Sequence, residues 1–100
     1  MQLQVHSIHF DADRKLLNFI EEKLNKLEVF HDQIISAEVF LRLDKSESNE
    51  NKLTEIKVSV PGKDLFAKKQ CKSFEESTDE VVEALRRQIK KHKAKTAARA

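Results

Sequence analysis

Residues 53–71 read LTEIKVSVPGKDLFAKKQC, with apolar and polar residues alternating on either side of a Pro-Gly pair. In the first run, isoleucine and valine recur at every second position, which is the pattern of a strand with one buried face. Pro61 fixes φ and Gly62 accepts a positive φ, so the pair suits the centre of a type II turn. The stretch therefore predicts a β-hairpin with strands at 53–60 and 63–71.

Two further strands are predicted upstream of this hairpin. Residues 44–52, DKSESNENK, hold no apolar side chain and indicate a loop that enters the hairpin. A strand is also expected at 2–10, where the apolar phase slips near His6 and indicates a bulge or the end of the strand. Residues 34–43, IISAEVFLRL, alternate like the hairpin and predict a half-buried strand with an inward face formed by Ile35, Ala37, Val39, Leu41 and Leu43.

Two other stretches have the apolar spacing of amphipathic helices. Residues 14–28 carry a leucine and isoleucine stripe, and Asp11 or Asp13 offers the N-cap. Residues 74–95 carry a second stripe, with acids near its start and bases near its end. The first helix should have a basic flank and an acidic flank, formed by Lys15, Lys23 and Lys26 on one side and by Glu21 and Glu28 on the other.

The predicted order is thus β-α-β-β-β-α, an α+β fold. Two amphipathic helices can cover one face of a four-stranded sheet and leave its other face polar and in contact with water. A helical crossover makes the first two strands parallel, and the rest can pair as an antiparallel meander. A chain of 100 residues holds one such domain, expected at 1–95 with a frayed tail at 96–100.

Composition excludes several classes of protein. The single cysteine cannot form an internal disulfide, no apolar run approaches the roughly 18 residues of a membrane span, and the N-terminus lacks the features of a secretory signal. We therefore expect a cytoplasmic protein. One glycine is too few for a phosphate-binding loop, and neither Cys71 nor the histidines have catalytic or metal-ligand spacing. We expect no enzyme activity, no cofactor and no metal site.

The charge is distributed unevenly along the chain. Residues 86–100 hold seven bases and no acid, whereas the other 85 residues hold 12 bases and 17 acids. The helix dipole and pairs such as Glu83–Arg87 explain some of these charges, but not the acid-free run. Such asymmetry indicates a polyanionic partner, either structured RNA or an anionic membrane surface. The chain has no Trp or Tyr, and its phenylalanines fall mostly on apolar stripes, so RNA would be bound through phosphates and shape.

Two segments within this order carry a family resemblance: Glu22–Glu28, EKLNKLE, and Leu85–Lys93, LRRQIKKHK. They resemble the short ribosome hibernation-promoting factors, also called ribosome-associated translation inhibitors or sigma-54 modulation proteins. The resemblance implies a fold like the double-stranded-RNA-binding domain. It also implies binding to ribosomal RNA of the small subunit, in the channel of messenger and transfer RNA near the decoding centre. Translation would be inhibited and idle ribosomes protected in stationary phase and under stress.

By position, the resemblance assigns RNA binding to Lys23 and Lys26 of the first helix and to Arg87, Lys91 and Lys93 of the last. Arg86 and Lys90 are added charges in the same run. Two modes of action stay open, the pairing of ribosomes together with a second hibernation factor and the blocking of single ribosomes. The oligomeric state of the free protein also stays open. The alternative functions are a generic structured-RNA-binding module and a peripheral protein of anionic membranes.

Overall fold

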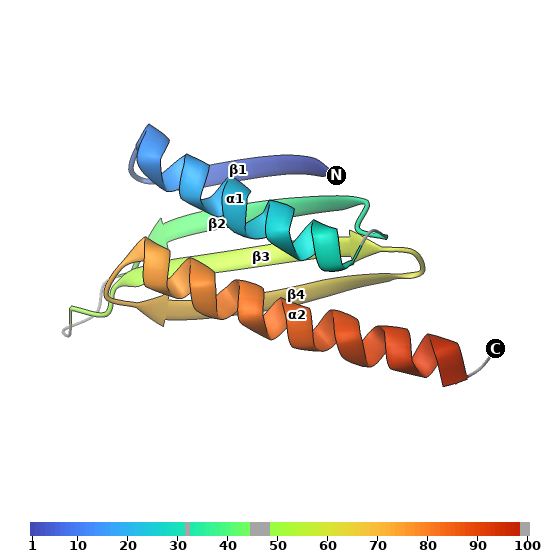
Figure 1. The fold of residues 1–100 in the computed structure, drawn as a ribbon. Helices are drawn as coiled ribbons and strands as arrows, with labels where there is room; N and C mark the ends of the chain where they lie inside the picture. Colours follow the sequence, from blue (N-terminus) through green and yellow to red (C-terminus); the bar gives the residue numbers. More distant parts are fainter. Residues whose placement is uncertain (32, 45–48, 99–100) are drawn as a thin grey trace.

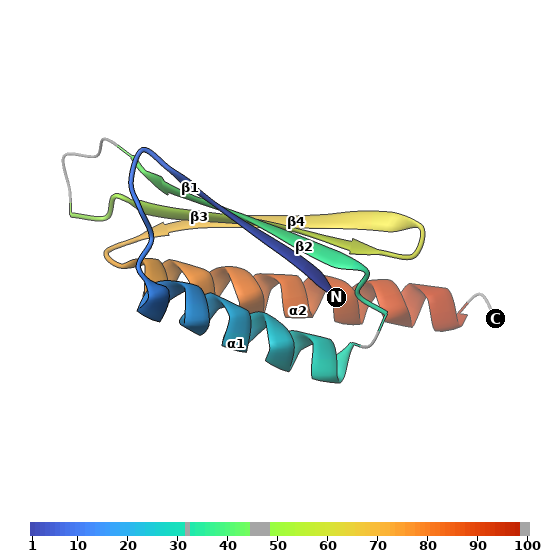
Figure 2. The same cartoon turned by 90° about the horizontal axis from the view of Figure 1, so that it is seen from above.

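The computed structural model describes residues 1–31, 33–44 and 49–98. The elements in chain order are β1 (Gln2–Ile8), α1 (Arg14–Phe30), β2 (Ser36–Leu43), β3 (Lys52–Val60), β4 (Lys63–Cys71) and α2 (Phe74–Ala98). The strands form one sheet in the order β1-β2-β3-β4, with β1 parallel to β2 and the other neighbours antiparallel. Both helices lie side by side on one face of this sheet (Figures 1 and 2). The predicted fold is confirmed.

The core lies between the sheet and the two helices. Ile20 and Leu24 of α1 and Leu85 of α2 are fully buried, as are Val39 and Ile56 of the sheet. Burying each such side chain contributes about 1.5–3 kcal/mol, which is why the two apolar stripes hold the helices to one face. The opposite faces of the helices remain in contact with solvent and carry the charged side chains.

Local chemistry sets the ends of these elements. Asp13 is the N-cap of α1, where its carboxylate accepts a hydrogen bond from the Leu16 backbone N–H at 2.8 Å. Gly62 has a φ of 80°, the conformation that the Pro61–Gly62 turn was expected to need. This tight turn places the start of β4 beside the end of β3.

A buried hydroxyl cluster fixes α2 over β3. The Ser77 hydroxyl donates to the Phe74 carbonyl at 3.2 Å, which leaves it as the acceptor for Thr54 of β3 at 2.6 Å. Thr78 lies 3.4 Å from the same Thr54 oxygen, and all three hydroxyl residues are fully buried. Because buried polar groups need partners, this cluster favours one rotation of α2 about its axis.

The first strand differs from its prediction. β1 pairs without a bulge from Gln2 to Ile8 and then stops, because His9 leaves the extended conformation with a φ of 68°. The chain reversal turns Phe10 towards the helices, where it stacks on Phe74 with ring centroids 4.9 Å apart. The apolar phase slip therefore marks the end of the strand.

Two residues expected on the inward face of β2 are exposed instead. Ile35 is 58% exposed and Leu43 is 44% exposed, whereas Ala37, Val39 and Leu41 between them are buried as predicted. Ile35 precedes the strand and Leu43 is its last residue. Ile34, directly before Ile35, is buried in the core, so the alternation that predicts burial holds only within the strand between its two ends.

The open face of the sheet is less polar than expected. Phe40 stacks on His6 with ring centroids 4.9 Å apart, and Phe66 is 48% exposed. Phe66 is an exception to the expectation that most phenylalanines fall on apolar stripes. At the end of the chain, α2 continues past the predicted limit at Lys95 to Ala98.

Candidate nucleic-acid interface

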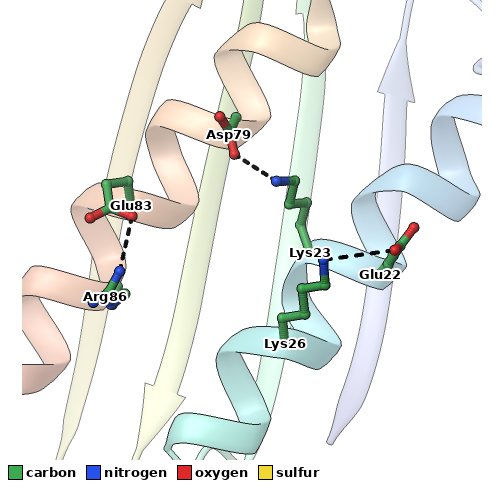
Figure 3. Close-up of polar contacts among 6 residues, drawn as sticks. All are labelled: Glu22, Lys23, Lys26, Asp79, Glu83 and Arg86. Atoms are coloured by element: carbon green, nitrogen blue, oxygen red, sulfur yellow. Dashed lines mark ion pairs between the residues drawn. The ribbon is translucent and has the colours of Figure 1, made fainter.

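On the basic flank of α1, Lys23 lies towards α2. Lys23 Nζ lies 2.9 Å from Asp79 Oδ1 on α2 (Figure 3). The same ammonium group is 5.5 Å from the ring centroid of Phe19. On the other flank, Glu28 pairs with the N-terminal ammonium of Met1 at 2.9 Å. The two charged flanks of α1 are therefore arranged as predicted, but the ammonium group of Lys23 already has an acidic partner.

Acids also accompany two other predicted RNA-binding residues. Lys26 Nζ is 3.9 Å from Glu22, and Arg86 Nη1 is 3.5 Å from Glu83 (Figure 3). The first half of α2 is rich in acids, and the two helices run side by side in the same direction (Figure 1). The region between the helices is therefore mixed in charge rather than uniformly basic.

The second half of α2 is different. Among the described residues, no acid pairs with Arg87, Lys90, Lys91 or Lys93, and all four are exposed. The expected Glu83–Arg87 pair is not the one that forms, because Glu83 lies against Arg86 instead. Four cationic side chains are thus free to meet a polyanion.

These side chains do not all point to the same side of α2. Asp79 marks the side towards α1, and Gln88 marks the side towards β4 because its amide donates to the Phe66 carbonyl at 3.0 Å. Successive helical residues are about 100° apart around the axis. Arg86 follows Asp79 by two turns and therefore lies on the α1 side, whereas Arg87 points about 100° away from it. The cationic groups therefore surround the exposed part of α2 instead of forming one cleft between the helices. Most of this half of α2 lies alongside β4, where Gln88 contacts Phe66, and only the end of the helix extends past the β3–β4 turn (Figure 1).

A groove that the sequence did not reveal runs along the β4 side of α2. Its volume is about 240 Å³, and it is lined by Lys63, Leu65, Gln88, Lys91 and His92. Of these residues, only Lys91 was predicted to bind RNA. Lys63 carried no sequence signal, because its position beside α2 depends on how the helix packs across β4.

The chemistry of Cys71 agrees with a structural role. Its thiol is buried and donates to Glu80 Oε2 at 2.9 Å, which joins the end of β4 to the start of α2. Burial first, and the neighbouring Glu80 carboxylate second, raise its pKa to about 12. The thiol is therefore protonated and poorly nucleophilic at neutral pH. The potential ligand atoms of Cys71, Glu76 and Glu80 all lie within 4.8 Å of one another, a grouping that the sequence spacing did not indicate.

The fold and this surface define a small α+β domain with a cationic helix suited to a polyanion. Neither described helix is long and apolar enough to cross a membrane. The sequence profile of the family described as Sigma 54 modulation protein / S30EA ribosomal protein matches residues 3–97. The chain belongs to this family, which confirms the resemblance carried by the two helical segments. The family consists of ribosome-associated, non-enzymatic proteins, in agreement with the expected absence of catalysis.

Individual relatives agree with this assignment. The ribosome hibernation promoting factor of Pseudomonas putida is 26% identical over 95 residues, covering 95% of this chain and 89% of the relative. The Azotobacter vinelandii factor of the same name is 27% identical over 95 residues, covering 95% and 85%.

Two solved structures share the fold. A ribosomal subunit interface protein from Coxiella burnetii has a TM-score of 0.83 at 21% identity, covering 94% of this chain and 99% of that one. The N-terminal domain of Thermus thermophilus Protein Y has a TM-score of 0.78 at 22% identity, covering 92% and 99%.

Proposed function

We propose that this protein is a cytoplasmic ribosome hibernation factor. In this proposal it binds ribosomal RNA of the small subunit, in the channel of messenger and transfer RNA near the decoding centre. Occupying that channel inhibits translation and protects idle ribosomes. The names of the curated relatives support the hibernation role. The observation that carries the RNA contact is a set of exposed basic side chains on α2 that have no acid partner in the part of the chain that the structure describes: Arg87, Lys90, Lys91 and Lys93.

In the proposed binding, the cationic side chains recognise the phosphates and the shape of the RNA. Arg87 to Lys93 extends about 9 Å along the helix axis, enough for contacts to more than one phosphate. Each basic side chain that contacts a phosphate of a simple nucleic acid displaces counterions from it. If all four basic side chains did so here, a plot of log affinity against log salt concentration would have a slope of about −3. The one phenylalanine of α2, Phe74, is buried, and the helix has no Trp or Tyr, so it offers no exposed large aromatic ring on which RNA bases could stack.

The proposal is tested by reversing charge on α2. A variant with Arg87→Glu and Lys91→Glu should lose co-sedimentation with purified small subunits while keeping the circular dichroism spectrum of the parent. The matched control is Lys57→Glu with Lys68→Glu, which makes the same charge change on exposed strand residues of the open sheet face. Equal loss in both variants, or retained binding in the first, would contradict the assignment of these residues.

The same cationic side chains would also suit other structured RNA, because phosphates are common to all of it. Competition between small subunits and duplex RNA at matched salt separates the two functions, since a hibernation factor should prefer the subunits. A membrane function has less support, because Leu85 and Ile89 of the α2 stripe are buried against the sheet.

The two modes of action, pairing ribosomes and blocking single ribosomes, need a separate experiment. Sucrose gradients run with and without a second hibernation factor show whether ribosomes pair.

A further inference from the structure

We infer that the groove between β4 and the second half of α2 is a binding site for the phosphate backbone of RNA, with Lys63 as a contact supplied by the sheet. This inference rests on the proposed RNA binding and adds a third element to the two helices. The groove holds about 240 Å³ and is lined by Lys63 and Leu65 of β4 and by Gln88, Lys91 and His92 of α2.

The fold positions both walls of this groove. Lys63 is the first residue of β4, directly after the turn at Gly62, and pairs in register with Val60. Two residues later, Leu65 is buried and anchors the strand in the core. On the opposite wall, the Gln88 amide donates to the Phe66 carbonyl and ties α2 to the edge strand at 3.0 Å. A site between two anchored elements needs little rearrangement to bind a ligand.

The charge of the groove is of one sign. It is lined by two ammonium groups and an imidazole, and none of its lining residues is an acid. In the described part of the chain, neither Lys63 nor Lys91 forms an ion pair. A recess lined by charges of one sign concentrates the electrostatic potential and attracts counterions.

This contrasts with the region between the helices, where Lys23 is paired with Asp79 at 2.9 Å. On the β4 side of α2, by contrast, Lys63 and Lys91 have no acid partner among the described residues, so the groove keeps its positive charge. A phosphate placed between Lys63 and Lys91 would offset the repulsion between the two ammonium groups and accept hydrogen bonds from both.

The lining of the groove favours RNA over a membrane surface as its ligand. Membrane-binding patches place exposed apolar side chains beside their lysines. The apolar residue of this groove, Leu65, is only 3% exposed, so it offers no surface that could enter a bilayer. A phosphate backbone needs only cationic groups within a recess, and that is what the groove provides.

The first test removes the sheet contact alone. Lys63→Gln should weaken binding to small subunits by about fourfold to sixfold at 0.15 M salt, the loss expected for one phosphate contact. The matched control Lys57→Gln removes the same charge from an exposed residue on the open face of the sheet and should change affinity by less than twofold. Equal affinities of the two variants would overturn the inference.

The second test examines the groove without the ribosome. A short RNA duplex added to the isotope-labelled full chain should shift the NMR signals of the Gln88 side-chain amide and of His92, and Lys63→Gln should reduce these shifts. If small subunits fail to bind while these signals move, the proposed ribosomal function is contradicted and the groove is supported as an RNA site. If the subunits bind while the signals do not shift and Lys63→Gln has no effect, the groove is contradicted as an RNA site and the proposed ribosomal function is supported. Binding that depends on Lys63 but occurs only with anionic vesicles would also overturn the inference.

Discussion

Replacing Asp79 by Asn should strengthen RNA binding while slightly weakening the fold. The carboxylate of Asp79 holds the ammonium of Lys23 at 2.9 Å, and their side chains are 62% and 31% exposed. An ion pair this exposed stabilises a protein by about 0.2–1 kcal/mol, which is the expected loss in unfolding free energy. A Lys23 side chain released to contact one phosphate would tighten binding about fourfold to sixfold at 0.15 M salt.

The assay is the affinity for small subunits over a series of salt concentrations, together with urea unfolding. The slope of log affinity against log salt should steepen by about 0.7–0.9 for one added contact. Glu75→Gln is the matched control, because it removes the same charge one turn earlier on α2, from an acid with no ion pair in the described residues. Unchanged affinity and slope for Asp79→Asn, or a gain no larger than the control's, would refute the idea that Asp79 withholds Lys23 from RNA.

Three further predictions concern the fold. The raised pKa of Cys71 should make its alkylation at neutral pH much slower than in the urea-unfolded chain. The thiol of the unfolded chain ionises at a lower pH than the buried thiol. The free energy of unfolding, relative to that of Cys71→Ser, should therefore fall as pH rises from 9.0 to about 12, by at most about 1.4 kcal/mol per pH unit. A difference between the two proteins that does not change with pH would contradict this. Leu85→Ala, at a fully buried position, should cost about 2–5 kcal/mol in urea unfolding, and a cost under 1 kcal/mol would show that α2 packs loosely. Ser77→Ala should cost about 1–3 kcal/mol because it removes the 2.6 Å partner of Thr54, and adding Thr54→Val should restore part of the loss; no recovery would argue against an unsatisfied hydroxyl.

Much of the fold could be predicted because its signals are local. The Pro61–Gly62 turn needs a positive φ that glycine supplies, and Gly62 adopts it at 80°. The stripe that includes Ile20 and Leu24 follows the period of a helix, and both residues are buried. Period and turn chemistry depend on neighbours in sequence, so they can be read without the tertiary structure.

What could not be predicted depends on contacts between distant segments. The charge on Lys23 is visible in the sequence, but its partner Asp79 lies on the other helix. Lys63 becomes a wall of the groove only when α2 packs across β4. Ile35 has the spacing of a core residue, but it precedes β2 and is 58% exposed, while its neighbour Ile34 is buried in the core. In each case the residue's surroundings follow from packing, which the sequence pattern does not contain.

Lysine-reactivity footprinting tests the central claim most directly. The full chain, free or bound to small subunits, is acetylated and the modification of each lysine is measured by mass spectrometry. We predict that Lys63, Lys90, Lys91 and Lys93 lose reactivity on binding, while Lys57 and Lys68 on the open face of the sheet keep theirs. Protection of the open face with α2 still reactive would contradict the claim that this protein meets ribosomal RNA through the cationic half of its last helix.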